Sequence, residues 1–346
     1  MKAAIFKGKG NIELEKRPDP TIDKQTDAIV RVVMGCVCGS DLWYYRGINP
    51  HKVGSIGHEF IGLIDKIGAN VKNLKTGDLV IAPFTFCDGV CSNCEAGFQS
   101  QCIHGGAFGN GDTDGGQGEY VRVPFASTTL VKVPAGKYSE DMLASFLSLS
   151  DVICTGYHAA VSAQIKQGDT VAVVGDGAVG LGGVIGAKLL GAKRIIALSH
   201  NPSRQKLAKE FGATVIVEER GDKAVAAVMQ LTKGVGVDAA LECVGTDQSI
   251  ETAAAITRPG GMIGAVGFPT YQNFEYKTLF WKNVGIRGGV APARQYIPIL
   301  LKEVLVGNIN PGKVFDLRLK LDDIKEAYAA MDERRAIKAL INIGEL

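Results

Sequence analysis

A glycine-rich turn between an apolar strand and an apolar helix constrains this chain more than any other feature. The strand is expected over Thr170–Val174, the turn Gly175-Asp176-Gly177-Ala178-Val179-Gly180 follows at once, and the helix runs to Leu190. The first glycine permits the tight turn, the second lets backbone approach a pyrophosphate, and the third lets the helix pack on the strand. Free amide groups at the positive end of the helix then face phosphate. This context predicts a dinucleotide site formed by Gly175, Gly177, Ala178, Val179 and Gly180. The alternative is a packing turn in a chain with 44 glycines.

Hydrophobic runs divide the chain into two kinds of segment. Up to about residue 150 they are short and strand-like, separated by Gly, Pro and Asp turns: Ala28–Val33, Phe60–Ile67, Leu79–Ala82 and Tyr120–Val123. From Asp151 strands and helices alternate, which predicts a parallel sheet: Thr170–Val174, Ala178–Leu190, Arg194–Leu198, Ser203–Phe211, Asp238–Cys243 and Gly261–Val266. A helix over Asp322–Met331 and a strand over Lys338–Ile343 end the chain. We therefore expect an α/β protein with a β-rich domain of residues 1–151 and 291–346, a dinucleotide-binding domain of residues 152–290, and a cleft between them.

The end of the second strand of the parallel sheet bears on coenzyme preference. A site that prefers NAD(H) usually has an acidic residue there, which accepts hydrogen bonds from the ribose hydroxyls. Here the strand ends in Ser199-His200-Asn201, without a carboxylate to repel a 2′-phosphate. Ser199 can donate to such a phosphate, with His200 and Arg204 as cationic partners, although Arg204 could equally be a solvated helix residue. The pattern favours NADP(H), with NAD(H) still possible.

Composition narrows the class of partner. The 346 residues are 46% hydrophobic and 21% charged, with a net charge of +2, so no strong field favours nucleic acid or an anionic membrane. A small-molecule ligand is the better expectation. Met1–Gly8 lacks the charged, apolar and small-residue order of a secretory signal, and the apolar stretch near Val171–Leu190 is broken by Asp176 and glycines. We therefore expect a cytoplasmic protein whose eight cysteines are reduced thiols.

Four of these cysteines cluster in one loop as Cys87-x3-Cys91-x2-Cys94-x7-Cys102. Four thiolates at such spacing match the tetrahedral sulfur shell of a closed structural zinc site. A chance cluster of core thiols is the alternative, and the polar residues Asp88, Ser92, Asn93 and Glu95 between them argue against it.

Further motifs occur with the cysteine loop and the glycine turn: Cys38-Gly39-Ser40-Asp41, Gly57-His58-Glu59 and Gly116-Gln117-Gly118-Glu119-Tyr120. In their order and near spacing, all five motifs resemble the zinc-containing medium-chain dehydrogenase/reductase family, the alcohol dehydrogenase superfamily, over essentially the whole chain. The segment Ser150-Asp151-Val152-Ile153-Cys154 is similar to the bacterial branch that uses an aspartate as zinc ligand.

The resemblance implies a GroES-like β-rich catalytic domain, a doubly wound Rossmann domain and a catalytic zinc. Cys38, His58 and Asp151 would be its ligands, with Glu59 a nearby carboxylate able to enter the coordination shell. Cys36 and Cys154 are rival ligands that we interpret as core thiols. His158 is expected to pack on the helix that enters the Rossmann domain, and nothing indicates a role for His104.

Other roles also follow from the resemblance. Ser40 would carry the proton away from the substrate oxygen, and Asp41 would orient His58. Trp43 stands where many relatives have a relay histidine, His51 is a candidate replacement, and Trp43 could narrow the substrate pocket. The first interval of the cysteine loop is one residue longer than in the commonest form. The remaining cofactor contacts implied are Gly245, Val266, Gly267, Gly288-Gly289-Val290 and Lys338, each of which could instead be a turn glycine or a solvated lysine.

These features predict a zinc-dependent alcohol dehydrogenase that moves hydride between a small primary or secondary alcohol, or its aldehyde or ketone, and NADP(H). One alternative is a formaldehyde or polyol dehydrogenase that uses NAD(H). A second is a non-catalytic zinc- and NADPH-binding relative, although a binding protein has no need of an open metal position. Relatives are dimers or tetramers, so a homodimer or homotetramer is expected.

Overall fold

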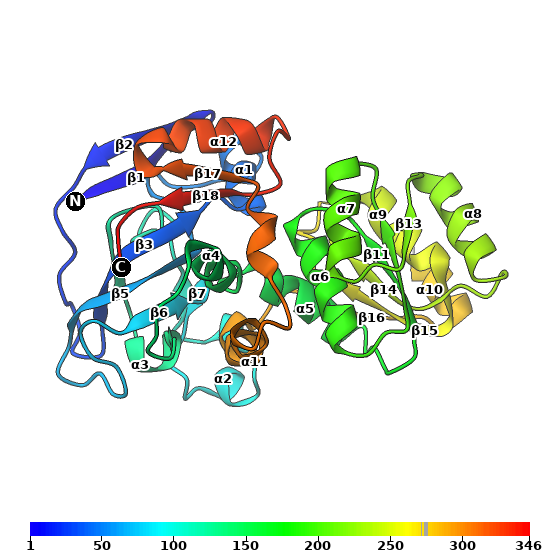
Figure 1. Ribbon diagram of the computed structural model, residues 1–346, viewed down its shortest axis with the longest axis horizontal. Helices are drawn as coiled ribbons and strands as arrows, with labels where there is room; N and C mark the ends of the chain where they lie inside the picture. Colours follow the sequence, from blue (N-terminus) through cyan, green and yellow to red (C-terminus); the bar gives the residue numbers. More distant parts are fainter. Residues whose placement is uncertain (271, 273–275) are drawn as a thin grey trace. The chain divides into compact units, whose positions relative to one another are not determined.

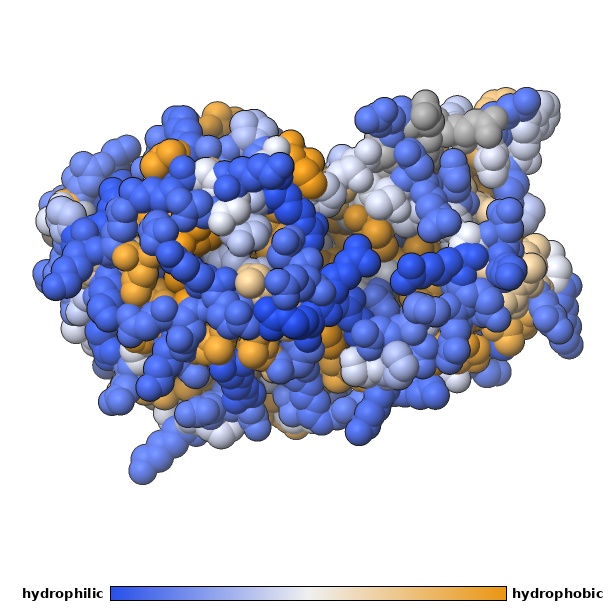
Figure 2. Space-filling model, turned by 90° about the horizontal axis from the view of Figure 1, so that it is seen from above, coloured by the Kyte–Doolittle hydropathy of each residue, from blue (hydrophilic) through white to orange (hydrophobic). Residues whose placement is uncertain are grey.

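The computed structural model describes residues 1–270, 272 and 276–346, which form two compact units (Figure 1). Unit 1 contains Met1–Asp151 and Pro292–Leu346, and unit 2 contains Val152–Ala291. Ala291, expected in the first domain, therefore belongs to unit 2. Within the described ranges, every helix is too short or too polar to cross a membrane. Figure 2 shows hydrophilic side chains over most of the visible surface, with hydrophobic atoms in small groups between them.

Unit 1 is built on β-sheets. A three-stranded sheet has the order β2-β1-β4, a larger sheet has the order β10-β6-β5-β3-β18-β17 with β9 also paired to β3, and β7 pairs with β8. Their bounds are β1 Lys2–Gly8, β2 Asn11–Lys16, β3 Ala28–Cys36, β4 Gly54–Ser55, β5 Phe60–Ile67, β6 Leu79–Ala82, β7 Thr85–Phe86, β8 Gly106–Ala107, β9 Tyr120–Val123, β10 Val131–Lys132, β17 Leu317–Lys320 and β18 Ala339–Asn342. The last strand, β18, pairs antiparallel with β3, with Leu340 opposite Cys36. The C-terminal segment thus completes the sheet that leads into Cys38.

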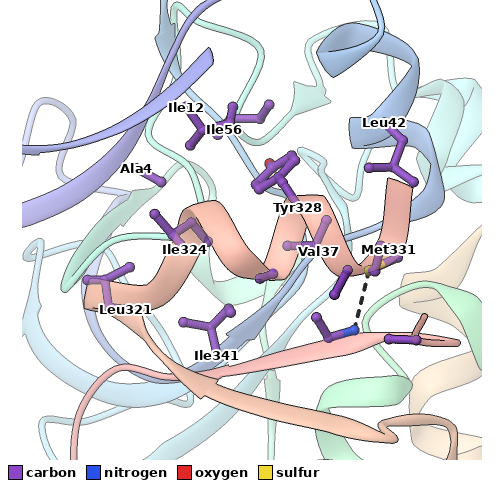
Figure 3. Packing of buried hydrophobic residues seen from close by; sticks show 14 of the residues in the cluster. Ala4, Ile12, Val37, Leu42, Ile56, Leu321, Ile324, Tyr328, Met331 and Ile341 are labelled. Atoms are coloured by element: carbon purple, nitrogen blue, oxygen red, sulfur yellow. Dashed lines mark hydrogen bonds between the residues drawn. The ribbon is translucent and has the colours of Figure 1, made fainter. Parts of the chain in front are cut away.

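Helices pack around these sheets. They are α1 Gly39–Tyr45, α2 Ser92–Glu95, α3 Ala126–Thr129, α4 Glu140–Ser148, α11 Ala293–Leu305 and α12 Ile324–Asp332, with 3-10 turns at Gln99–Gln101, Pro311–Val314 and Leu321–Asp323. In Figure 3 the apolar face of α12 directs Ile324 and Tyr328 into a cluster with Ile12, Ile56 and Val37. All five side chains are at most 2% exposed. Because Val37 precedes Cys38 in the chain, this core holds the backbone from which the Cys38 thiol projects.

Unit 2 is a doubly wound parallel sheet. Its six strands have the order β13-β12-β11-β14-β15-β16, and every pairing is parallel. Their bounds are β11 Thr170–Val174, β12 Arg194–Leu198, β13 Val215–Val217, β14 Val237–Glu242, β15 Thr257–Ala265 and β16 Gly285–Gly288. The helices are α5 Val152–Ser162, α6 Ala178–Leu189, α7 Pro202–Phe211, α8 Gly221–Leu231, α9 Asp247–Ile256 and α10 Tyr276–Lys282. The strand order reverses between β11 and β14, which is where such sheets bind ligands. The expected α/β fold, a β-rich unit with a doubly wound parallel-sheet unit, is confirmed.

Candidate functional site

Four side chains of unit 1 bring metal-binding atoms together. Cys38 is the N-cap of α1, His58 and Glu59 directly precede β5, and Asp151 lies three residues beyond α4. One ligand atom from each lies within 4.8 Å of all the others. The Cys38 thiol is 3.5 Å from Asp151 Oδ2, and His58 Nε2 is 3.3 Å from the same oxygen. A thiol, an imidazole and two carboxylates form a donor set suited to Zn²⁺.

Asp41 lies behind these ligands and contacts two of them, and Gln117 contacts Asp41. Asp41 Oδ1 lies 3.4 Å from His58 Nδ1, on the side of the ring away from Asp151. Asp41 Oδ2 accepts the backbone N–H of Cys38 at 3.0 Å and the side-chain amide of Gln117 at 3.2 Å. Tyr328 in turn donates to Gln117 Oε1 at 2.9 Å. Gln117 belongs to the Gly-Gln-Gly motif, which was noted in the sequence without a role for its amide.

Lys338 is not placed as the sequence predicted. Its side chain is 1% exposed, and its ammonium donates to Glu59 Oε1 at 2.6 Å and to the carbonyl of Val37 at 3.1 Å. The prediction that it contacts a cofactor phosphate is therefore wrong, because the ion pair with the buried Glu59 already engages its charge. Glu59 is 0% exposed, and its other oxygen, Oε2, has no hydrogen-bond partner among the described residues. A buried unpaired carboxylate oxygen is costly unless a cation or a proton satisfies it.

The electrostatics of the group also fit a cation. Burial raises the pKa of the Cys38 thiol, and it raises the pKa of Glu59, in each case against the opposing charge of Lys338. Burial acts to lower the pKa of His58, but Asp41 and Cys38 outweigh it and hold that pKa well above its usual value. Metal ligands bind in their deprotonated forms, so a divalent cation would act against the raised pKa values of Cys38, Glu59 and His58.

A second cluster lies in the cysteine loop, and its membership differs from the prediction. Ligand atoms of Asp88, Cys91, Cys94 and Cys102 lie within 4.8 Å of one another, and Cys87 is not in the group. The Cys87 thiol is 1% exposed and donates to the carbonyl of Thr128 at 3.7 Å, and burial raises its pKa to about 11.

The extra residue in the first interval accounts for the exchange. Asp88, and not Cys87, is separated from Cys91 by two intervening residues, the same interval that separates Cys91 from Cys94. Asp88 Oδ1 accepts the backbone N–H groups of Val90 at 2.9 Å and Cys91 at 3.1 Å, and Oδ2 bonds His104 Nδ1 at 2.6 Å. His104, for which the sequence suggested no role, thus orients this carboxylate.

The other residues of the expected proton route lie near Cys38 in the sequence. Ser40 and Trp43 are in α1, and both are half-buried. Both ring nitrogens of His51 lie against backbone carbonyls, those of Lys52 and Gly109, the latter at 2.9 Å. The rivals Cys36 and Cys154 are at most 1% exposed, and His158 is 6% exposed within α5. These burials fit core positions.

In unit 2 the glycine turn has the form of a phosphate cradle. Gly175 has φ +115°, and a Cβ on Gly180 would lie 2.0 Å from the Gly175 carbonyl oxygen, so the first and third glycines are required by the fold. Gly177 has nothing within 4 Å of an added Cβ. It caps α6 without a side-chain hydrogen bond, and Ala178 and Val179 form the first turn of that helix. The open space beside uncapped helix amides suits a pyrophosphate, which an added Cβ would obstruct.

At the end of β12 the structure places a carboxylate that the residues following this strand did not indicate. Asp176, the second residue of the glycine turn, accepts a hydrogen bond from Ser199 Oγ at 2.8 Å and an ion pair from Arg204 Nη1 at 3.1 Å. His200 is exposed, with Nδ1 3.2 Å from the carbonyl of Glu218. The expectation of NADP(H) assumed that no carboxylate stands here, and that assumption is wrong.

The remaining predicted contacts gather at the carboxyl ends of β14, β15 and β16. Glu242 joins the loops after β14 and β15: its Oε1 accepts the N–H of Gly245 at 2.7 Å, and its backbone oxygen accepts those of Val266 at 2.9 Å and Gly267 at 3.2 Å. Gly289 follows β16 with φ +100°. Glu242 is 0% exposed, and nothing in the sequence distinguished it from other strand-end residues.

Comparison with known proteins is consistent with both units. Residues 24–135 match the profile described as "Alcohol dehydrogenase GroES-like domain", and residues 178–305 match "Zinc-binding dehydrogenase". The chain is 34% identical to an uncharacterized zinc-type alcohol dehydrogenase-like protein AdhB of Bacillus subtilis, over 96% of this chain and 97% of that protein. It is also 34% identical to an alcohol dehydrogenase of Cupriavidus necator, over 97% and 96%. The structure of alcohol dehydrogenase TADH from Thermus sp. ATN1 has a TM-score of 0.91 at 31% identity, covering 99% of this chain and 100% of that one.

Proposed function

Because the chain belongs to the family of zinc-binding alcohol dehydrogenases, we propose that it transfers hydride between a small primary or secondary alcohol, or its carbonyl form, and a nicotinamide coenzyme. It is a zinc-dependent oxidoreductase that uses a nicotinamide cofactor. The proposed zinc ligands are Cys38, His58 and Asp151. The observation that carries the assignment is the convergence of their ligand atoms beside a buried, unpaired oxygen of Glu59.

Each residue of this site has a role that its contacts support. A zinc ion held by these residues would supply the Lewis acidity that lowers the pKa of an alcohol, and a nicotinamide coenzyme would supply the hydride acceptor. Asp41 holds the His58 ring in the orientation that presents Nε2 to the group. Lys338 holds Glu59 by one oxygen, which leaves the other available to the site.

Proton transfer is assigned to Ser40. Its position in the first turn of α1, two residues after Cys38, suits a hydroxyl that accepts the proton released by the alcohol. The indole of Trp43 is a donor only, so it cannot accept a proton at the position where a histidine would act. The ring of His51 is held by two backbone carbonyls, so water or a coenzyme hydroxyl would complete the route.

The second cluster is proposed as a structural zinc site. Asp88, Cys91, Cys94 and Cys102 would form a closed shell of four protein ligands without a vacancy for substrate. Such a site stabilises its loop and takes no part in the reaction.

Initial rates with short primary and secondary alcohols, measured with NAD and NADP before and after chelation, test the proposal. We expect activity to disappear with the metal and to return with added Zn²⁺. Asp151→Asn should abolish turnover and release one zinc per chain. Cys154→Ser, at the rival thiol, should retain turnover and the full zinc content. Activity that persists after verified loss of all metal would refute the mechanism.

The residues also suit a formaldehyde or polyol dehydrogenase that uses NAD(H), because Asp151 and the other zinc ligands serve that chemistry equally. The same alcohol panel, extended to formaldehyde and sorbitol, separates the two. A binding-only protein would hold zinc and coenzyme but show no turnover with any member of the panel.

A further inference from the structure

The carboxylate of Asp176 lies at the end of the second strand of the parallel sheet, although the residues that directly follow this strand in the sequence include no acidic residue. β11 and β12 are neighbouring parallel strands, with Val174 opposite Leu198, so both end at the same edge of the sheet. Asp176 lies two residues beyond β11, and Ser199 lies one residue beyond β12. The hydrogen bond between their side chains, 2.8 Å long, brings the carboxylate to the end of the second strand.

That location is where a dinucleotide-binding sheet distinguishes its two coenzymes. In NAD-binding sheets an acidic residue at the end of the second strand accepts the ribose hydroxyl, and in NADP-binding sheets a nearby arginine accommodates the 2′-phosphate. This chain has both groups, bonded to each other. Arg204 Nη1 lies 3.1 Å from Asp176 Oδ1, and the two side chains are 18% and 24% exposed.

The hydrogen bonds of Asp176 are compatible with the ribose hydroxyls of NAD(H) and unfavourable for the 2′-phosphate of NADP(H). A carboxylate has about four lone-pair sites, and Asp176 uses one on each oxygen, so it can still accept ribose hydroxyls. A 2′-phosphate carries about two negative charges, which the Asp176 carboxylate would repel. Ser199 has a single hydroxyl proton, which it already donates to Asp176, and Arg204 would have to divide its positive charge between the Asp176 carboxylate and the phosphate.

We propose that Asp176 is the coenzyme-selecting residue of this enzyme and that, by engaging Arg204 and Ser199, it favours NAD(H) over NADP(H). The proposal rests on the dehydrogenase function argued above and reverses the preference expected from the sequence. A residue in the glycine turn, rather than one on the second strand, supplies the discriminating carboxylate.

Equilibrium binding of NADH and NADPH to the zinc-loaded, full-length enzyme tests this without turnover. Coenzyme fluorescence or calorimetry gives both dissociation constants. We expect the wild type to bind NADH at least about tenfold more tightly, and Asp176→Asn to shift the ratio toward NADPH by about tenfold, or about 1.4 kcal/mol. Glu251→Gln, which removes one exposed negative charge from α9 of the same unit, should leave the ratio unchanged.

A second variant separates selection from a general change in the site. Arg204→Gln in the Asp176→Asn background should weaken NADPH and leave NADH nearly unaffected, because only the phosphate needs the freed guanidinium. The proposal is overturned if the wild type prefers NADPH, or if Asp176→Asn leaves the ratio unchanged. A wild type that binds neither coenzyme would overturn the dehydrogenase function itself, which is a different result.

Discussion

The ion pair between Lys338 and Glu59 offers a stability test of the site. Lys338→Met keeps the apolar stem and removes the charge, so the Glu59 carboxylate, 0% exposed, loses the ammonium 2.6 Å away. The carbonyl of Val37 loses a donor at the same time. Because a buried charge without its partner keeps its desolvation penalty, the free energy of unfolding should fall by about 3–5 kcal/mol.

A double-mutant cycle isolates the pair. Glu59→Gln alone should also destabilise the protein, since it leaves the Lys338 ammonium buried and uncompensated. The double variant Glu59→Gln/Lys338→Met buries neither charge. We expect it to be more stable than the sum of the single changes predicts, by about 2 kcal/mol.

Urea unfolding of the chelated, metal-free protein provides the measurement. Trp43 lies in unit 1 and Trp281 is 73% exposed in unit 2, so Trp43 fluorescence in a Trp281→Phe background reports on the unit that holds the pair. Lys325→Met is the matched control: that lysine forms an ion pair with Glu13 while 62% exposed, and its loss should cost at most about 1 kcal/mol. A cost for Lys338→Met no larger than for Lys325→Met, or strict additivity in the cycle, would refute the reasoning.

Three further predictions follow from single contacts. Cys94→Ser should reduce bound zinc, measured by elemental analysis, from two ions to one per chain and lower the melting temperature. Cys87→Ser should retain both ions, and loss of zinc from this variant would contradict the ligand set of the cysteine loop. Gly180→Ala should destabilise unit 2, because its Cβ would lie 2.0 Å from a backbone oxygen. Gly177→Ala should fold normally but bind NADH at least about tenfold more weakly. Equal thermal stability of the two variants would contradict these roles of the two glycines. Trp43→Ala should raise kcat/KM for bulkier alcohols relative to ethanol, and an unchanged ratio would place this side chain outside the substrate pocket.

Four strands with apolar runs were predictable to the residue. The ranges Phe60–Ile67, Leu79–Ala82, Thr170–Val174 and Arg194–Leu198 coincide with β5, β6, β11 and β12. The helix α11 was not predicted, and it contains Pro298, which removes a helical hydrogen bond and usually argues against a helix. Tertiary packing of its buried face on unit 1 outweighs that local cost.

The candidate site shows a similar division. Cys38, His58 and Asp151 could be selected because the motifs that contain them resemble those of the zinc-containing dehydrogenase family, and the structure brings them together. The role of Lys338 could not be selected, since its partner Glu59 is 279 residues away. For Asp88 the only signal was an interval one residue too long.

The amino-acid order by itself determined the two kinds of unit, the glycine turn and the clustering of cysteines in one loop, because these depend on local patterns of apolar, glycine and cysteine residues. Which atoms meet was decided only by tertiary structure. In the cysteine loop the carboxylate of Asp88, and not the thiol of Cys87, joins the other three ligands, and the parallel pairing of β11 with β12 brings Asp176 to Ser199. Charges distant in sequence acquire their partners, and so their function, only when the sheets bring them within bonding distance.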